Sequence, residues 1–327
     1  MELHNANILL ICPDFFGYQK RIMHSLEDLG ATVEYLQDRP FSSFVMRALT
    51  SLFPITFSRL AEGHYLKRLT NIQRSEFDIV FVVNGQTLSR NVLSVLHDLL
   101  PKAKFVLYLW DSIENRPNVV GNFPYFDKIF SFDERDARRY RLGFRPLFYL
   151  KDYSVASQDS YSFDISFIGS IHSDRFLVLN MLRNRYKNKF RFYYYLYIQA
   201  YWVFLLYKFL KPSMGVKRYS EFRFLQLPVK QVQEILEDTV SVVDIEHPDQ
   251  SGLTIRTIEA VFSGRKLITT NSDIVNYDFY DSNNVLVIDR KYPVIPDGFL
   301  EGKATEMKPN LVDKYSIKGW LKELLIS

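Results

Sequence analysis

Short continuous apolar runs alternate, along the first half of the chain, with segments in which apolar residues recur every three or four positions. The first pattern predicts buried strands and the second predicts amphipathic helices. The predicted strands are 7–12, 31–36, 77–83, 104–110, 127–133 and 146–150, and the predicted helices are 19–29, 89–100 and 134–142. Strands without polar alternation are typical of a parallel sheet that helices cover on both faces.

The same alternation begins again after a polar, serine-rich segment, residues 151–162. The predicted strands of the second half are 163–170, 189–198, 240–245, 266–270 and 284–289, and the predicted helices are 174–186, 229–239 and 254–263. A chain of 327 residues also exceeds the usual size of one domain. We therefore expect an α/β protein of two Rossmann-like domains, residues 1–155 and 156–327, that face each other across a cleft, with the last helix packing back on the first domain.

The composition argues against several classes of protein. Cys12 is the single cysteine, which excludes an intrachain disulfide, and the six histidines lack the spacing of a metal site. The N-terminus has no basic segment followed by a long apolar run, so we expect a cytoplasmic protein without a signal peptide. Lys and Arg exceed Asp and Glu by only four, too few to suggest a nucleic acid partner. We expect no metal, no cofactor and no nucleic acid.

The aromatic share is high, 16%, and concentrates in residues 190–212, FRFYYYLYIQAYWVFLLYKFLKP. Charged residues interrupt this run, which leaves it too short for a membrane span. Its first half predicts a buried strand. Residues 200–211 predict a helix with two open interpretations: a core or interdomain helix, or an interfacial helix within a peripheral membrane contact over 200–218. The second interpretation turns four residues toward lipid, Trp202, Phe204, Leu205 and Phe209, and four toward anionic headgroups, Lys208, Lys211, Lys217 and Arg218.

One segment, HPDQSGLTIRTIEAVFSGRKLITTN (247–271), places a polar loop before a predicted helix. The helix is expected to begin near Thr254 and to end at Ser263-Gly264. The first turn of a helix presents backbone N–H groups that have no partner within the helix, and Ser251 and Gly252 would let the backbone close around an anion. The pattern therefore indicates a seat for a phosphate group.

Two charged residues on this helix extend the interpretation. Arg256 would add a charge-assisted contact to a diphosphate, and Glu259 would accept hydrogen bonds from a ribose diol. The alternative is purely structural: Thr254 is only an N-cap, Arg256 and Glu259 form a solvated pair, and Gly252 is a turn residue.

Several motifs resemble those of one enzyme group. DIEHPDQSGLTIRTIEAVFSGRKLITTN (244–271), YDFYDSNNVLVIDR (277–290) and YSIKGWLKELL (315–325) are similar to the C-terminal, donor-binding half of GT-B fold glycosyltransferases. The N-terminal PDFFGY, DRP (38–40) and YLWDSIEN (108–115) match the same group. More narrowly, most of the chain resembles bacterial lipopolysaccharide and capsular polysaccharide biosynthesis proteins that are related to the CgeB-like glycosyltransferases.

This resemblance implies a donor site in the second domain. In that fold the loop and helix at SGLTIRTIE hold the nucleotide diphosphate, and the acidic residue of the helix, here Glu259, binds the ribose. Many retaining members carry another Glu eight positions earlier, where this chain has Ser251, so the stereochemical outcome stays open. The residues to which the resemblance gives the diphosphate are Ser251, Gly252, Leu253, Thr254 and Arg256.

A second loop, GSIHSDR (169–175), matches the first loop of the donor domain. Gly169 would let the backbone approach a phosphate, and Arg175 would supply charge; a plain turn between strand and helix is the alternative.

An inverting reaction needs a general base, which we expect from the first domain. Asp14 follows the first predicted strand and Asp111 the fourth, so both lie at the carboxyl ends of strands. Either would take the proton from an acceptor hydroxyl; a turn residue after Pro13 and a helix cap are the structural alternatives. Arg256, the helix N-terminus and Arg175 would meet the charge of the leaving group without a metal.

Two further patterns leave alternatives open. Asp244 and Glu246 imitate the metal-binding D-x-D of the other glycosyltransferase fold, although two similar βα halves argue against that fold. His247-Pro248 resembles the His-Pro motif of some sialyltransferases, which keeps a cytidine donor open.

The sequence thus predicts a cytoplasmic, metal-independent glycosyltransferase, peripheral on the inner face of the membrane. Its donor is expected to be a nucleotide sugar, specifically a UDP-sugar, and its acceptor a lipid-linked surface glycan. Two alternatives share the fold: a nucleotide-sugar 2-epimerase, which forms product without an acceptor, and a non-catalytic partner subunit, which turns nothing over.

Overall fold

The structure is a computed structural model of the chain. It describes residues 3–14, 17–38, 61–69, 76–150, 160–216, 218–248 and 250–326. The chain divides into two compact units: unit 1 is Met1–Pro146 together with Ile317–Ser327, and unit 2 is Leu147–Ser316. The expected boundary after residue 155 and most of the expected linker lie outside the described residues.

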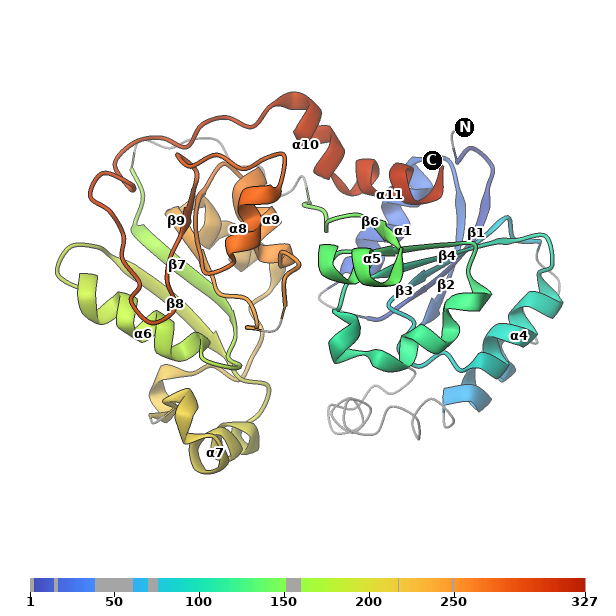
Figure 1. Ribbon diagram of the computed structural model, residues 1–327, viewed down its shortest axis with the longest axis horizontal. Coiled ribbons are helices and arrows are strands. Elements are labelled where there is room, and N and C mark those ends of the chain that lie inside the picture. Colours follow the sequence, from blue (N-terminus) through green and yellow to red (C-terminus); the bar gives the residue numbers. More distant parts are fainter. Residues whose placement is uncertain are drawn as a thin grey trace. The chain divides into compact units, whose positions relative to one another are not determined.

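Unit 1 contains a parallel sheet whose strand order is β2-β1-β3-β4-β5-β6 (Figure 1). Its strands are β1 (Asn7–Cys12), β2 (Thr32–Gln37), β3 (Ile79–Val83), β4 (Lys104–Leu109), β5 (Lys128–Ser131) and β6 (Gly143–Phe144). Every residue of β3 is buried, as the continuous apolar run predicts for a central strand that is covered on both faces.

The helices of unit 1 begin where side chains satisfy the first backbone N–H groups. The Ser89 side chain accepts from the Val92 N–H at the start of α4. The Asp133 side chain accepts from the N–H groups of Arg135 and Asp136 at the start of α5. The helices within the described ranges are α1 (Tyr18–Asp28), 61–69, α4 (Arg90–Leu99), α5 (Glu134–Tyr140) and α11 (Ile317–Leu325), with 3-10 helices at Ile113–Asn115 and Pro117–Tyr125.

The C-terminal helix α11 packs within unit 1. Trp320 is fully buried, and its ring lies edge-on to Tyr108 of β4 with 4.8 Å between the ring centroids. The buried Arg145 forms an ion pair with Glu323 at 2.8 Å, and Lys318 forms one with Asp28 at 2.8 Å. The last turns of the chain therefore complete the core of the unit that contains its first strand.

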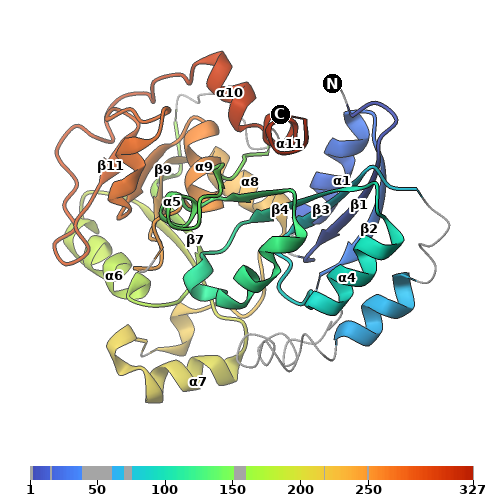
Figure 2. The same cartoon turned by 45° about the vertical axis from the view of Figure 1, so that its right-hand side comes forward.

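Unit 2 contains a second parallel sheet, of order β11-β10-β9-β7-β8. Its strands are β7 (Phe163–Ser170), β8 (Phe192–Tyr197), β9 (Thr239–Asp244), β10 (Lys266–Thr269) and β11 (Val285–Val287). Its helices in the described part are α6 (Arg175–Tyr186), α7 (Tyr201–Leu210), α8 (Val229–Glu237), α9 (Ile255–Phe262) and α10 (Pro309–Tyr315), with 3-10 helices at Pro212–Met214, Tyr219–Glu221 and Ser272–Asn276. In Figures 1 and 2, α7 projects from this unit below the sheet.

The α/β fold class with two parallel sheets is confirmed, but one predicted strand is wrong. Residues 147–150 are buried as their apolar pattern indicates, yet they lie outside both sheets. Pro146 has no N–H to give to a ladder, and the Tyr149 N–H donates instead to the Tyr315 carbonyl at 3.0 Å. Burial thus comes from packing against the end of α10 rather than from a sheet. No helix in the described ranges is long and apolar enough to cross a membrane.

Candidate functional site

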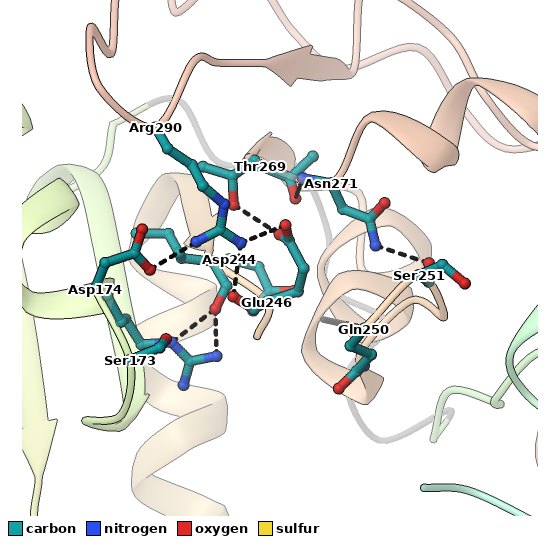
Figure 3. A network of polar contacts seen from close by, with 12 residues as sticks. Ser173, Asp174, Asp244, Glu246, Gln250, Ser251, Thr269, Asn271 and Arg290 are labelled. Atoms are coloured by element: carbon teal, nitrogen blue, oxygen red, sulfur yellow. Dashed lines mark hydrogen bonds and ion pairs between the residues drawn. The ribbon is translucent and has the colours of Figure 1, made fainter. Parts of the chain in front are cut away.

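Polar residues gather at the edge of the unit 2 sheet where its strands end (Figure 3). Asp244 is the last residue of β9, Thr269 is the last of β10, and Arg290 follows β11. In parallel α/β sheets this carboxyl edge is where ligands bind. The loop from Ile245 to Thr254 leads from this edge into α9.

The start of α9 is fixed by two threonine hydroxyls. Thr254 is the N-cap: its Oγ1 accepts from the Thr257 N–H at 3.2 Å, as the structural alternative anticipated. The same Thr254 hydroxyl donates to Asp244 Oδ2 at 2.6 Å, and the Thr257 hydroxyl donates to that oxygen at 2.5 Å. A buried carboxylate at the end of β9 therefore ties the strand to the first turn of the helix.

The loop before α9 is held by side-chain amides. Asn271 Nδ2 donates to the Ser251 carbonyl at 3.0 Å, and Gln250 Nε2 donates to the Gly252 carbonyl at 2.8 Å. Ser251, Gly252 and Leu253 are buried. Asp249 lies outside the described residues. The loop is thus a fixed feature of the fold, with carbonyls held by Asn271 and Gln250 and the helix N-terminus beyond it.

The helix ends as the sequence predicts. Ser263 is the C-cap, and Gly264 takes φ = +73°, the left-handed conformation that favours glycine after a helix. Ile258 is fully buried, and Phe262 stacks on Tyr149 with 5.0 Å between centroids. These contacts anchor the far end of α9 and leave its N-terminus at the sheet edge.

Arg256 and Glu259 form an ion pair at 2.8 Å, one turn apart on α9. The pairing agrees with the structural alternative, but the pair is not solvated: the Glu259 side chain is 0% exposed and that of Arg256 is 20% exposed. The guanidinium therefore lies at the boundary between solvent and a buried carboxylate. Of the two, Arg256 is the residue whose side chain an entering ligand can reach directly.

Arg290 is the centre of the network in Figure 3, although the sequence analysis did not select it. Its guanidinium contacts Asp174 Oδ1 at 2.7 Å, Glu246 Oε1 at 2.5 Å and the Glu246 carbonyl at 2.8 Å. Thr270 Oγ1 donates to the other Glu246 oxygen at 2.6 Å. These contacts join the segments that follow β7, β9, β10 and β11. Glu246, which imitates a metal ligand only in its sequence pattern, is engaged by an arginine and a hydroxyl.

Arg175, which the resemblance assigns to a phosphate, holds the backbone of two loops in this structure. It is buried, and its guanidinium donates to the backbone carbonyls of Ser170 at 2.7 Å and Ile245 at 2.7 Å. Gly169 is a residue of β7, where a Cβ would approach the Phe167 ring to 2.9 Å. Gly169 thus has a packing role and Arg175 anchors backbone carbonyls, while the phosphate contacts expected of both stay predictions.

His172 lies in the loop between β7 and α6, with its ring centroid 5.7 Å from that of His247. Burial, together with the nearby Arg175, His247 and Arg290, lowers the pKa of His172 to about 3. The imidazole is therefore neutral at physiological pH. Ser173, next in the chain, takes φ = +45°, which is uncommon for a residue other than glycine.

The two proposed bases lie in unit 1. Asp14 is exposed and accepts from the Gln19 side-chain amide. Asp111 accepts from Asn84 Nδ2 at 3.2 Å and pairs with Arg116 at 3.5 Å. The cap of the following 3-10 helix is Ser112 rather than Asp111, so the capping alternative for Asp111 is wrong. No grouping of His, Cys, Asp and Glu suited to a metal ion occurs among the described residues.

No family model and no curated protein sequence matches the chain. Solved structures do. An alpha-glucosyltransferase in complex with UDP and a 13-mer DNA containing a central A:G mismatch is similar over 98% of this chain and 95% of its own, with a TM-score of 0.60 and 11% sequence identity. The chain has the GT-B fold. A second match is HepE from Anabaena in complex with UDP and glucose, which covers 98% of this chain and 99% of its own, with a TM-score of 0.57 and 10% identity.

At such identities the likeness establishes the fold. The DNA belongs to the description of that glucosyltransferase, and the expectation of no nucleic acid partner for this chain stays a prediction. Sequence reasoning did not select His172, Thr270, Asn271 and Arg290. Like the residues that it did select, each of them lies within a few residues of the end of a predicted strand.

Proposed function

We propose that this chain is a glycosyltransferase that moves a sugar from a nucleotide sugar, specifically a UDP-sugar, to a lipid-linked surface glycan. The observation that carries the proposal is the N-terminus of α9, which Thr254, Thr257 and Asp244 fix at the carboxyl edge of the unit 2 sheet. The GT-B fold, shared with two proteins that were solved with UDP, supports a nucleotide-sugar donor.

The chemistry of this edge suits a nucleoside diphosphate. Backbone N–H groups of the first turn of α9 and the positive end of its dipole attract an anion, and the partly exposed Arg256 adds a cation beside them. Ser251, Gly252 and Leu253 form the loop that approaches the phosphates. Glu259, whose side chain is buried beside Arg256, receives the ribose hydroxyls once Arg256 turns from it toward the diphosphate. Because Arg175 is committed to backbone carbonyls, the second cation in this proposal is Arg290, whose guanidinium is 22% exposed.

The reaction itself requires a general base and a stabilised leaving group. A hydroxyl of the acceptor glycan attacks the anomeric carbon of the donor sugar, and its proton passes to Asp14 or Asp111. The bond between the sugar and the diphosphate breaks. Arg256 and the helix N-terminus stabilise the negative charge that develops on the departing UDP, so the proposal includes no metal.

A turnover assay tests the proposal. Purified protein is incubated with UDP-sugars in the presence and absence of a lipid-linked glycan extract, while UDP release and labelled product are followed. Acceptor-dependent release that falls by roughly a hundredfold or more in Asp14→Asn or Asp111→Asn supports the transferase and names the base. Release or a new nucleotide sugar without acceptor identifies an epimerase instead. Tight UDP binding without turnover in any mixture identifies a non-catalytic partner.

A further inference from the structure

Helix α7 has an apolar surface on both of its sides. Val203 and Phe204 point into unit 2, where Phe204 packs on Phe222 with 5.8 Å between centroids. The opposite side should be polar in a helix that faces only water, yet it is also apolar. Its exposed residues include Trp202, Leu206, Phe209 and Leu210, spaced as one helical face. Phe209 is 69% exposed and Leu210 is 74% exposed.

This arrangement corrects the residues that the sequence assigned to a lipid-facing side. Phe204 belongs to the core, and Leu206 and Leu210 take its place on the outer side. Lys217 lies outside the described residues. The exposed apolar residues near α7 are more numerous than the sequence pattern indicated, because Tyr219 and Leu225 in the following segment are exposed as well.

Residues 219–225 pack beside the first turn of α7 and expose further apolar side chains. Leu225 is 80% exposed, and Tyr219 is also exposed beside Tyr201, with 5.5 Å between ring centroids. Tyr201, Tyr219 and Phe224 line an open hollow of about 550 Å³. We call α7 and residues 219–225 together the α7 patch. A group of exposed apolar side chains on neighbouring segments marks an interaction site, whereas single exposed apolar residues do not.

The segment that contains the α7 patch is rich in positive charge. Residues 201–230 contain six Lys or Arg and one Asp or Glu, a net charge of +5, whereas the whole chain carries +4. The remainder of the molecule is therefore slightly negative. The exposed cations in this segment are Lys208, Lys211, Arg218, Arg223 and Lys230.

We propose that the α7 patch docks on an anionic lipid bilayer. Phe209 and Leu210 enter the boundary of the acyl chains, Trp202 and the tyrosines lie at the depth of the headgroups, and the lysines and arginines contact lipid phosphates. A second copy of the chain is a poorer occupant, because a two-fold interface would bring two strongly positive patches together. A nucleic acid would satisfy the cations but would leave Leu206, Leu210 and Leu225 facing a polar backbone.

Vesicle sedimentation tests the proposal and reads neither nucleotide binding nor turnover. The full chain is mixed with vesicles of phosphatidylcholine alone or of phosphatidylcholine with phosphatidylglycerol. We expect binding at least about tenfold stronger to the anionic vesicles, and weaker binding at high salt because the lysine and arginine contacts are screened. Failure of the wild type to bind anionic vesicles overturns the proposal.

Substitutions locate the contact. Phe209→Glu/Leu210→Glu should lower anionic vesicle binding by about tenfold or more, since both side chains are lost from the lipid. The matched control is Tyr292→Glu, an exposed aromatic of unit 2 that is 76% exposed and lies outside the patch; its binding should stay within about twofold. Equal binding by the double variant and the control overturns the assignment. An unchanged thermal midpoint in both variants establishes that they fold.

Tryptophan emission gives an independent reading from the wild type. Of the three tryptophans, Trp320 is buried and Trp110 is partly buried in unit 1, whereas Trp202 is 48% exposed on the α7 patch. Anionic vesicles should shift the emission to shorter wavelength, and Trp202→Phe should abolish the shift. Three results would rule out lipid as the partner. They are emission that does not change with vesicles, dimerisation of the protein through the patch, and tight binding of a single-stranded oligonucleotide in place of vesicles.

Discussion

The Thr254 hydroxyl donates to Asp244 Oδ2 at 2.6 Å and thereby joins the first residue before α9 to the last residue of β9. Thr254 Oγ1 also accepts from the Thr257 N–H, so the Thr254 side chain both caps the helix and fixes its position on the sheet. The helix N-terminus is consequently held in place before any ligand arrives. Such preorganisation lowers the cost of binding an anion there.

Thr254→Val should destabilise unit 2 and weaken nucleotide binding together. The substitution keeps the shape but removes the cap and one bond to the Asp244 carboxylate, which is expected to lower the free energy of unfolding by about 2 kcal/mol. Thr254→Ser retains the hydroxyl and is the matched control, with a change below about 1 kcal/mol. Urea unfolding measures the free energy of unfolding of both variants, and titration with UDP measures their nucleotide binding. A serine variant as unstable as the valine variant would show that the methyl group, not the hydroxyl, matters.

Glu259→Gln and Arg256→Gln should separate ribose binding from phosphate binding. Loss of the Glu259 carboxylate should weaken UDP by about tenfold and leave inorganic pyrophosphate nearly unaffected, because only UDP has a ribose. Arg256→Gln should weaken both ligands, because both carry the diphosphate. Calorimetric titration of each variant gives the four affinities. Equal losses for UDP and pyrophosphate in Glu259→Gln would remove the ribose assignment.

Glu259→Ala is a poorer probe, since loss of the fully buried side chain would leave a cavity and remove the ion pair with Arg256. Any loss of binding in that variant would mix an effect on folding with one on the ligand.

Arg290→Met should destabilise the sheet edge by roughly 2–4 kcal/mol. It leaves Asp174 and the buried Glu246 without their shared cation, and uncompensated buried charge is costly. Lys189→Met, which breaks the exposed pair with Asp297 in the same unit, is the control and should change stability by no more than about 1 kcal/mol. Comparable urea midpoints for the two variants would show that the Arg290 network contributes no more than a surface pair.

His172 should make the protein less stable in mild acid. Its pKa is lowered to about 3 in the folded state, whereas an unfolded histidine titrates near 6.5. Above pH 6.5 both states are neutral and the group has no effect; below it the unfolded state binds a proton that the folded state does not. The free energy of unfolding should therefore fall, by up to about 1.4 kcal/mol per pH unit, as pH decreases from 6.5 toward 3.

The comparison of wild type with His172→Gln between pH 8 and pH 5 isolates this effect, because most carboxylates remain ionised there. As the pH decreases, the free energy of unfolding of the wild type should fall relative to that of the variant. A constant difference across this range would place the pKa of His172 close to its ordinary value.

The sequence predicted most strands of the fold because continuous apolar runs report burial on both faces directly. The prediction for residues 146–150 was wrong for the same reason: burial was real, but the Tyr149 N–H donates to a carbonyl at the end of α10, and no local pattern reveals that partner. Helix α9 was predicted at both ends, since Thr254 and Gly264 are strong local signals.

The site was less accessible to sequence reasoning. A local pattern identified the loop 251–254 and the charged residues of α9, but not which arginine anchors backbone and which remains exposed. Arg175 and Arg290 both follow strands, and only the tertiary structure shows that the first is committed to carbonyls and the second bridges two carboxylates.

The most direct test of the account is calorimetric titration of UDP into the wild-type protein and into Arg256→Gln, with and without a chelator, alongside GDP, CMP, dTDP and ADP. We predict saturable UDP binding that the chelator does not change and that weakens by about tenfold or more in the variant, because the diphosphate lies at the N-terminus of α9 beside Arg256. Absence of UDP binding, or equal UDP affinity in the wild type and the variant, would contradict the proposed donor site.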